Sequence, residues 1–134
     1  MTDLIEELEK LRGRDLQLYA AACLRDYCEI KAIHHIAIDE LLEHLMAYPT
    51  ASPISSWQQQ GALLALNGRG DELPQTLAAQ VKANDLQEFS TLVDSAVEVG
   101  IVDLYGAHTE SPLQFLLKML RIFEKNRFNL PARP

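Results

Sequence analysis

The sequence has few of the residues that mark disulfide-bonded or metal-binding proteins. Its 134 residues include only two cysteines, Cys23 and Cys28. In a helix this i,i+5 spacing points the two side chains about 140° apart, so they cannot form a disulfide with each other. The spacing also lacks the CxxC pattern of redox and zinc sites. We therefore expect two buried, unreactive free thiols, because burial raises the pKa of a thiol.

Long hydrophobic runs are also missing. The longest ones, such as Ala62–Leu66, are far shorter than the roughly 18 residues that a membrane-spanning helix needs. The first ten residues carry four acidic side chains before any apolar run, which is the opposite of a signal peptide. The sequence therefore predicts a soluble protein without a membrane partner, located in the cytoplasm.

Basic residues are scarce over most of the chain. The sequence holds 12 Lys and Arg against 19 Asp and Glu, a formal net charge of -7. Residues 1–31 contribute -2, residues 32–117 contribute -9 and residues 118–134 contribute +4. Because nucleic acids are bound by clustered Lys and Arg, this balance argues against a nucleic-acid partner. The acidic middle section would instead attract a basic protein, and a merely solubilising surface is the alternative interpretation.

Sequence signatures of catalysis and cofactor binding are absent. The glycines form neither GxGxxG nor a phosphate loop, and there is no GxSxG elbow. Arg69–Asp71 spells the integrin-binding tripeptide, which we interpret as a turn. The sequence predicts no cofactor. It leaves open whether the protein is an enzyme, and it favours one that is not.

Apolar residues recur at helical spacing through nearly the whole chain. No second strand-like run exists to pair with the β-prone residues 101–106, so a sheet is not expected. Capping residues, prolines and glycines predict helices over about 2–12, 15–32, 38–48, 55–66, 74–81, 85–100 and 111–126. The sequence thus predicts an all-α fold, a compact single-domain bundle or orthogonal array of about six or seven helices over residues 1–126. Residues 127–134 are predicted to be a frayed C-terminal tail.

One segment concentrates potential metal ligands: His34, His35, Asp39, Glu40, Glu43 and His44. If a helix began early enough, His35, Asp39 and Glu43 would share a face at i, i+4 and i+8, with His44 close by. Imidazole and carboxylate ligands suit a first-row metal. A metal-dependent or His-assisted enzyme is therefore one hypothesis, and a solvated polar face of the helix is the other.

Two further stretches combine apolar anchors with acidic neighbours. The connector between the last two predicted helices contains Tyr105 together with Asp103, His108 and Glu110, and Trp57 and Tyr48 flank a Pro/Ser-rich connector. Aromatic anchors inside a charged rim are typical of binding hot spots. These six residues are candidates for a partner-binding site, and the alternative is that their side chains fix the connectors to the core.

The leading hypothesis is a non-enzymatic binding or inhibitory protein that presents an acidic helical surface to a basic partner. In size, acidity and helical content the chain is similar to bacterial immunity proteins, which neutralise basic toxins, often nucleases. That resemblance implies a toxin-immunity role, and an adaptor role is the related option. A homo-oligomeric helical structural protein, in which the basic C-terminus meets the acidic middle of a neighbour, is a third hypothesis.

Overall fold

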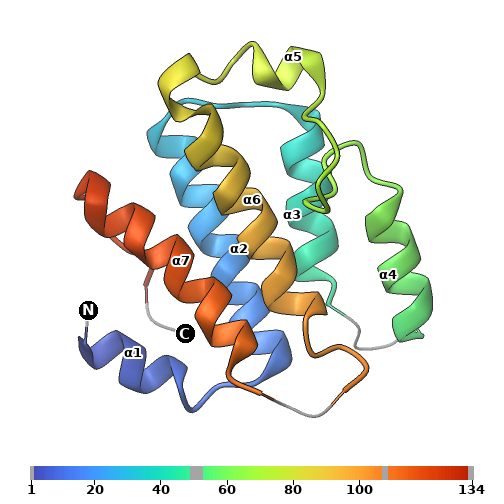
Figure 1. Cartoon of the computed structure of the whole chain (residues 1–134), viewed down its shortest axis with the longest axis vertical. Helices are drawn as coiled ribbons and strands as arrows, with labels where there is room; N and C mark the ends of the chain where they lie inside the picture. The colour runs from blue at the N-terminus through green and yellow to red at the C-terminus, as the bar shows by residue number, and fades with distance from the viewer. Residues whose placement is uncertain (1, 49–52, 107–108, 133–134) are drawn as a thin grey trace.

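Seven α-helices and one short 3-10 helix form the part of the chain that the computed structural model describes, which is residues 2–48, 53–106 and 109–132 (Figure 1). Their bounds are α1 (Thr2–Leu8), α2 (Gly13–Ile30), α3 (Ile36–Met46), α4 (Ile54–Ala62), α5 (Gln75–Ala78), η1 (Ala83–Asp85), α6 (Leu86–Ile101) and α7 (Ser111–Asn126). Within these ranges there is no strand, and the predicted all-α bundle of about seven helices is confirmed.

The three long helices α2, α6 and α7 pack on one another and form the centre of the bundle (Figure 1). Each carries an apolar stripe at helical spacing, as in Phe89, Leu92, Val93 and Ala96 of α6, all of which are buried. Aromatic rings fill the middle, where Tyr27 stacks on Phe89 with ring centroids 6.3 Å apart. None of the described helices is long and apolar enough to cross a membrane.

Helix α3 packs against α2 at the edge of this centre, and α4 lies beyond α3 (Figure 1). The sequence predicted a loop near residues 34–37 and a helix from Ile38, but α3 begins at Ile36. His35 is the N-cap, and its Nδ1 accepts a hydrogen bond of 3.0 Å from the Ala37 backbone N–H. The imidazole thus satisfies one of the unpaired donors at the start of the helix. The prediction missed it because His is not among the usual capping residues.

Two carboxylates at the start of α6, those of Asp85 and Glu88, contact neighbouring elements. Asp85 occupies the N-cap position, but its side chain makes no capping hydrogen bond and pairs with Lys31 at 3.3 Å. Glu88 accepts hydrogen bonds from the Tyr27 hydroxyl at 2.9 Å and from the Asn126 amide at 3.1 Å. Both carboxylates therefore tie α6 to neighbouring elements instead of closing its first turn.

Both cysteines are free and buried, as the sequence predicted. Burial in the core raises the pKa of each thiol, to about 12 for Cys28. The nucleophilic thiolate is therefore disfavoured at both positions.

The end of the chain packs against the core over the residues that the structure describes. The Phe128 ring lies edge-on against Tyr27 and Phe123, with centroids 6.2 and 6.0 Å away. Tyr19 donates a hydrogen bond of 3.0 Å to the Pro131 carbonyl oxygen. These contacts hold Phe128 and Pro131 against the core, whereas the sequence predicted a frayed tail over residues 127–134.

Candidate partner-binding surface

One side of α3 combines exposed apolar side chains with carboxylates. Ile36, Asp39, Glu43 and Met46 follow one another at i, i+3, i+7 and i+10, so they share a face of the helix. The side chains of Ile36 and Met46 are 67% and 53% exposed. Together with the half-buried Leu42 we call these residues the α3 strip. Asp39, Leu42, Glu43 and Met46 line a shallow, open hollow in it.

The strip is exposed because α3 carries more apolar residues than the core can cover. Ala37, Ile38, Leu41 and Leu45 are buried on the inner side of α3. Leu41, Leu42, Leu45 and Met46 recur at the spacing of a single apolar helix face. The structure buries Leu41 and Leu45 fully and leaves Met46 on the surface. Exposed apolar side chains gathered on one helix face make this strip a candidate interaction surface.

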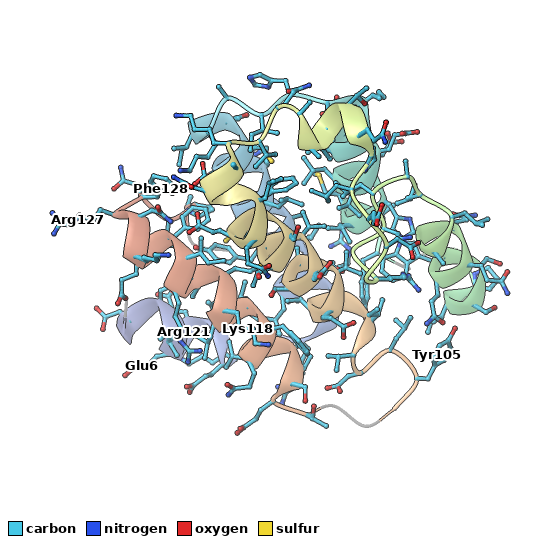
Figure 2. All side chains as sticks on the ribbon, turned by 45° about the horizontal axis from the view of Figure 1, so that its top comes forward. Glu6, Tyr105, Lys118, Arg121, Arg127 and Phe128 are labelled. Carbon is cyan, nitrogen blue, oxygen red and sulfur yellow. The ribbon has the colours of Figure 1, made fainter. Side chains whose placement is uncertain are left out.

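The carboxylates on α3 have no cation beside them. Among the described residues the ion pairs are Arg25–Asp26, Lys31–Asp85 and Lys125–Glu88, and none involves α3. Helix α3 itself contains no Lys or Arg, and Asp39, Glu40 and Glu43 are all exposed. The basic side chains Lys118 and Arg121 belong to α7, on the other side of α6 (Figures 1 and 2). The strip therefore lies in a locally uncompensated negative field.

The predicted anchor Trp57 is a buried residue of α4. Its side chain is only 3% exposed, and its indole stacks on the His44 imidazole with centroids 4.5 Å apart. The indole N–H donates to the His44 carbonyl oxygen at 2.9 Å. Tyr48 is half-buried and meets the same indole edge-on at 5.3 Å, and burial raises the pKa of its hydroxyl. These two aromatic residues fasten α4 to α3 and leave little ring surface for a partner.

The three candidates in the α6–α7 connector that the structure describes do not form one cluster. Asp103 accepts hydrogen bonds from the Thr109 backbone N–H and hydroxyl, at 2.6 and 2.8 Å, and thereby closes the connector on itself. Tyr105 is 65% exposed and points away from the bundle (Figure 2). Glu110 precedes α7 and lines a groove between α1 and α7. His108 lies outside the described residues.

The proposed metal ligands are likewise not brought together. His35 uses its ring nitrogens for the α3 cap and for a 2.7 Å hydrogen bond with the Thr76 hydroxyl. His44 faces α4, whereas Asp39 and Glu43 lie on the strip. Across residues 2–48, 53–106 and 109–132, no group of three His, Cys, Asp or Glu side chains is placed to hold a metal ion. The predicted i, i+4, i+8 alignment required His35 to be helical, and its extended φ of -156° prevents this.

The His44 imidazole lies in a buried corner beside Gly61 and Arg69. The His44 Nε2 is buried, has no hydrogen-bond partner among the described residues and lies close to Gly61, where a Cβ would be 2.6 Å from it. The Arg69 guanidinium occupies the same corner, and its Nη2 donates to the Gln58 carbonyl oxygen at 3.1 Å. Burial, followed by the positive charge of Arg69, lowers the pKa of His44. This corner has no room for a ligand, so we regard it as a structural joint between α3, α4 and the turn at Arg69.

Comparison with known proteins adds no further constraint: no family model, no curated protein and no solved structure matches the chain.

Proposed function

We propose that this protein is a non-enzymatic binding protein that docks a basic protein partner on the α3 strip. The observation that carries the proposal is the placement of exposed Ile36 and Met46 beside Asp39 and Glu43 on one face of α3. Sequence reasoning selected the two carboxylates, but as metal ligands. It missed the two apolar residues, whose exposure cannot be read from periodicity.

The two kinds of side chain would contribute differently to binding. The carboxylates would steer a cationic partner toward the strip and fix its orientation, an effect that salt weakens. Ile36, Leu42 and Met46 would supply apolar area that leaves water on binding, which prolongs the complex. Methionine suits such a surface because its flexible thioether adapts to the partner's shape.

The partner that fits is a basic protein with apolar side chains among its lysines and arginines. The inhibitory form of the proposal is a toxin-immunity role, in which the strip covers a cationic active site such as that of a nuclease. The net charge of -7 and the absence of cations on α3 support this form. An adaptor would use the same strip without blocking the partner's activity.

The test uses the intact protein with a photo-reactive residue in place of Met46, irradiated in an extract of its own host. We expect one predominant adduct with a protein of basic isoelectric point. The same probe at Gln59, an exposed residue of α4, is the control and should not yield this adduct. An acidic partner, or equal labelling from both positions, would contradict the proposal.

Charge variants then test whether binding depends on the carboxylates of the α3 strip or only on the net charge of the protein. D39N/E43Q removes two charges from the strip, and E6Q/E29Q removes two from exposed positions on α1 and α2. For the captured partner we expect D39N/E43Q to weaken binding at least about fivefold in low salt, and E6Q/E29Q less than about twofold. Equal effects would mean that the strip is not the site. Loss of the partner's own activity on binding distinguishes the inhibitor from the adaptor.

A further inference from the structure

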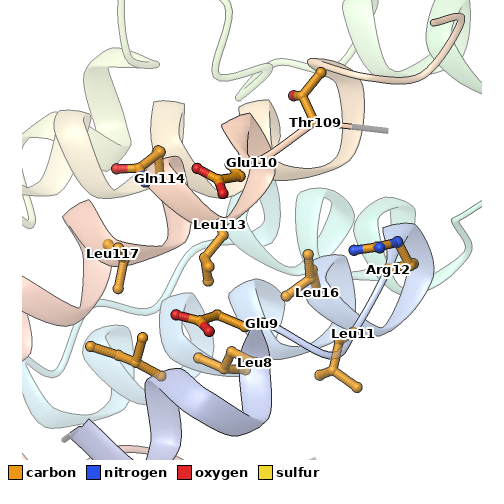
Figure 3. A pocket seen from close by; sticks show the side chains of 11 residues that line it. Leu8, Glu9, Leu11, Arg12, Leu16, Thr109, Glu110, Leu113, Gln114 and Leu117 are labelled. Carbon is orange, nitrogen blue, oxygen red and sulfur yellow. The ribbon is translucent and has the colours of Figure 1, made fainter. Parts of the chain in front are cut away.

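A groove of about 480 Å³ separates α1 from the first turns of α7 (Figure 3). Its lining mixes aliphatic and polar side chains from α1, the α1–α2 connector, α2 and the start of α7, and the aliphatic ones are Ile5, Leu8, Leu11, Leu16, Leu113 and Leu117. Leu8 and Leu16 are buried, so the aliphatic surface open to a ligand belongs to the half-exposed Ile5, Leu113 and Leu117. The volume lies within the range of small-molecule sites. The groove shares no residue with the α3 strip.

The rim of this groove carries an excess of negative charge. Glu9, directly after α1, and Glu110, directly before α7, line it from opposite walls, and Arg12 is the one cation among its described lining residues. Figure 3 shows Arg12 at the end of the groove beside Leu11 and Leu16, and Glu110 on the wall formed by α7. All three side chains are exposed, and none takes part in an ion pair among the described residues. The two carboxylates are therefore available to a ligand.

We propose that this groove binds an aliphatic amine, a molecule with an apolar carbon chain that ends in an ammonium group. The half-exposed Ile5, Leu113 and Leu117 would take the chain out of water, and Glu9 and Glu110 would pair with the ammonium. An aliphatic carboxylate has the same chain but the wrong charge, since it would meet two carboxylates and only one guanidinium. The proposal does not depend on the α3 strip and would stand if the strip bound nothing.

The first experiment compares ligands of matched length on the purified protein. Octylamine, octanoate and butylamine are titrated separately by calorimetry in low salt at neutral pH. We expect octylamine to bind more tightly than octanoate. Shortening the amine should weaken binding by up to about fourfold for each methylene removed. Equal or tighter binding of octanoate overturns the proposal, as does an affinity for amines that does not depend on chain length.

The second experiment measures octylamine affinity in variants that remove one charge from the rim. Removing a carboxylate should weaken binding, and removing the guanidinium should strengthen it. E9Q and E110Q should each weaken octylamine binding about twofold to fivefold, because each removes one exposed charge pair. R12Q should strengthen it by a similar factor. E6Q is the matched control, since Glu6 lies on α1 outside the groove, and it should change nothing. Thermal unfolding of every variant checks that it is folded.

Two outcomes would overturn the assignment of the groove. One is an equal response of E6Q, E9Q and E110Q in folded protein, which would mean that net charge alone attracts the amine. The other is tighter binding of Nα-acetyl-lysine methylamide than of octylamine, which would assign the groove to a lysine side chain of a protein.

Discussion

Gln17 and Gly100 form a matched pair between α2 and α6. Gln17 is fully buried, and its side-chain amide donates a hydrogen bond of 2.8 Å to the Ala96 carbonyl oxygen. Its Oε1 lies against the Cα of Gly100, where a Cβ would overlap it. This Oε1 has no hydrogen-bond partner in the described part of the chain. The absence of a side chain at Gly100 is thus what allows a polar residue to lie between the two helices.

Replacing Gly100 by alanine should therefore destabilise the protein. In an unconstrained helix this change would raise the free energy of unfolding by about 1 kcal/mol. Here the added methyl group must displace a buried side chain, and we expect a net loss of about 1–3 kcal/mol in the free energy of unfolding, measured with urea.

Two variants test the cause of that loss. G106A adds a methyl group where no described atom other than those of its chain neighbours lies within 4 Å, and it should change stability by less than about 0.5 kcal/mol. Q17A/G100A removes the obstructing side chain and should recover part of the loss. If Q17A/G100A is less stable than the sum of the two single changes predicts, overlap between these residues is not the cause.

The joint at His44 predicts a dependence of stability on pH. Burial and then the nearby Arg69 lower the pKa of His44, so the folded state binds fewer protons than the unfolded state. The contribution of His44 to stability is therefore complete above about pH 6.5, the ordinary pKa of histidine. It is lost as the pH falls from there toward the lowered pKa of His44 in the folded state. We expect the free energy of unfolding to decrease between about pH 7 and pH 5, which fluorescence of the only tryptophan, Trp57, can follow.

Three substitutions test whether His44 causes this dependence of stability on pH. H44Q should remove the histidine contribution, and R69Q should reduce it, because the second cause of the lowered pKa is then gone. H34Q is the control for an exposed histidine and should leave the slope intact. A slope that H34Q removes and H44Q does not would refute the role given to the buried imidazole.

The sequence predicted the central helices well because their stripes are long and regular. Leu116, Leu120 and Phe123 recur at i, i+4 and i+7, and all three are buried in α7. The predicted start of α3 was wrong because the β-branched residues near Ile36 suggested a break in the helix. In the structure the helix begins at Ile36, where the His35 side chain caps it. Local patterns do not report a cap made by an unusual side chain.

The candidate surface was predictable only in its charge. Asp39 and Glu43 could be picked out as a carboxylate-rich segment of a helix. The exposure of Ile36 and Met46 depends on which neighbouring helices cover each face of α3, and periodicity does not supply that packing order. Trp57 shows the converse, because an aromatic residue beside a connector can be a surface anchor or a core residue, and the structure buries it.

If the α3 strip serves binding and not folding, its apolar residues should be dispensable for stability. Ile36 and Met46 are largely exposed in the folded protein, so I36S and M46S remove little buried area. We expect each to change the free energy of unfolding by less than about 0.5 kcal/mol, apart from a small helix-propensity cost. L45A, one position from Met46 and buried, should cost about 2–5 kcal/mol. A comparable loss in M46S would mean that the strip is part of the core.

Helices α2 and α7 end in the same way, with a residue in the left-handed conformation. Ala32 has φ 56° and Arg127 has φ 58°. In each case the next residue donates its N–H to a carbonyl five positions back, Ile33 to Cys28 at 2.8 Å and Phe128 to Phe123 at 2.9 Å. Glycine is the usual residue at this position, because a Cβ there is strained by about 1–2 kcal/mol.

A32G and R127G should therefore stabilise the protein, although Ala to Gly normally destabilises a helix. Relief of strain outweighs the greater freedom of glycine in the unfolded chain, and we expect a net gain of about 0.5–1 kcal/mol from each. A79G is the matched control, since Ala79 is exposed at the end of α5 but has φ -65°. It should lower the free energy of unfolding by about 0.5–1 kcal/mol. Urea unfolding that shows the same loss in A32G and A79G would contradict the strained conformation at Ala32.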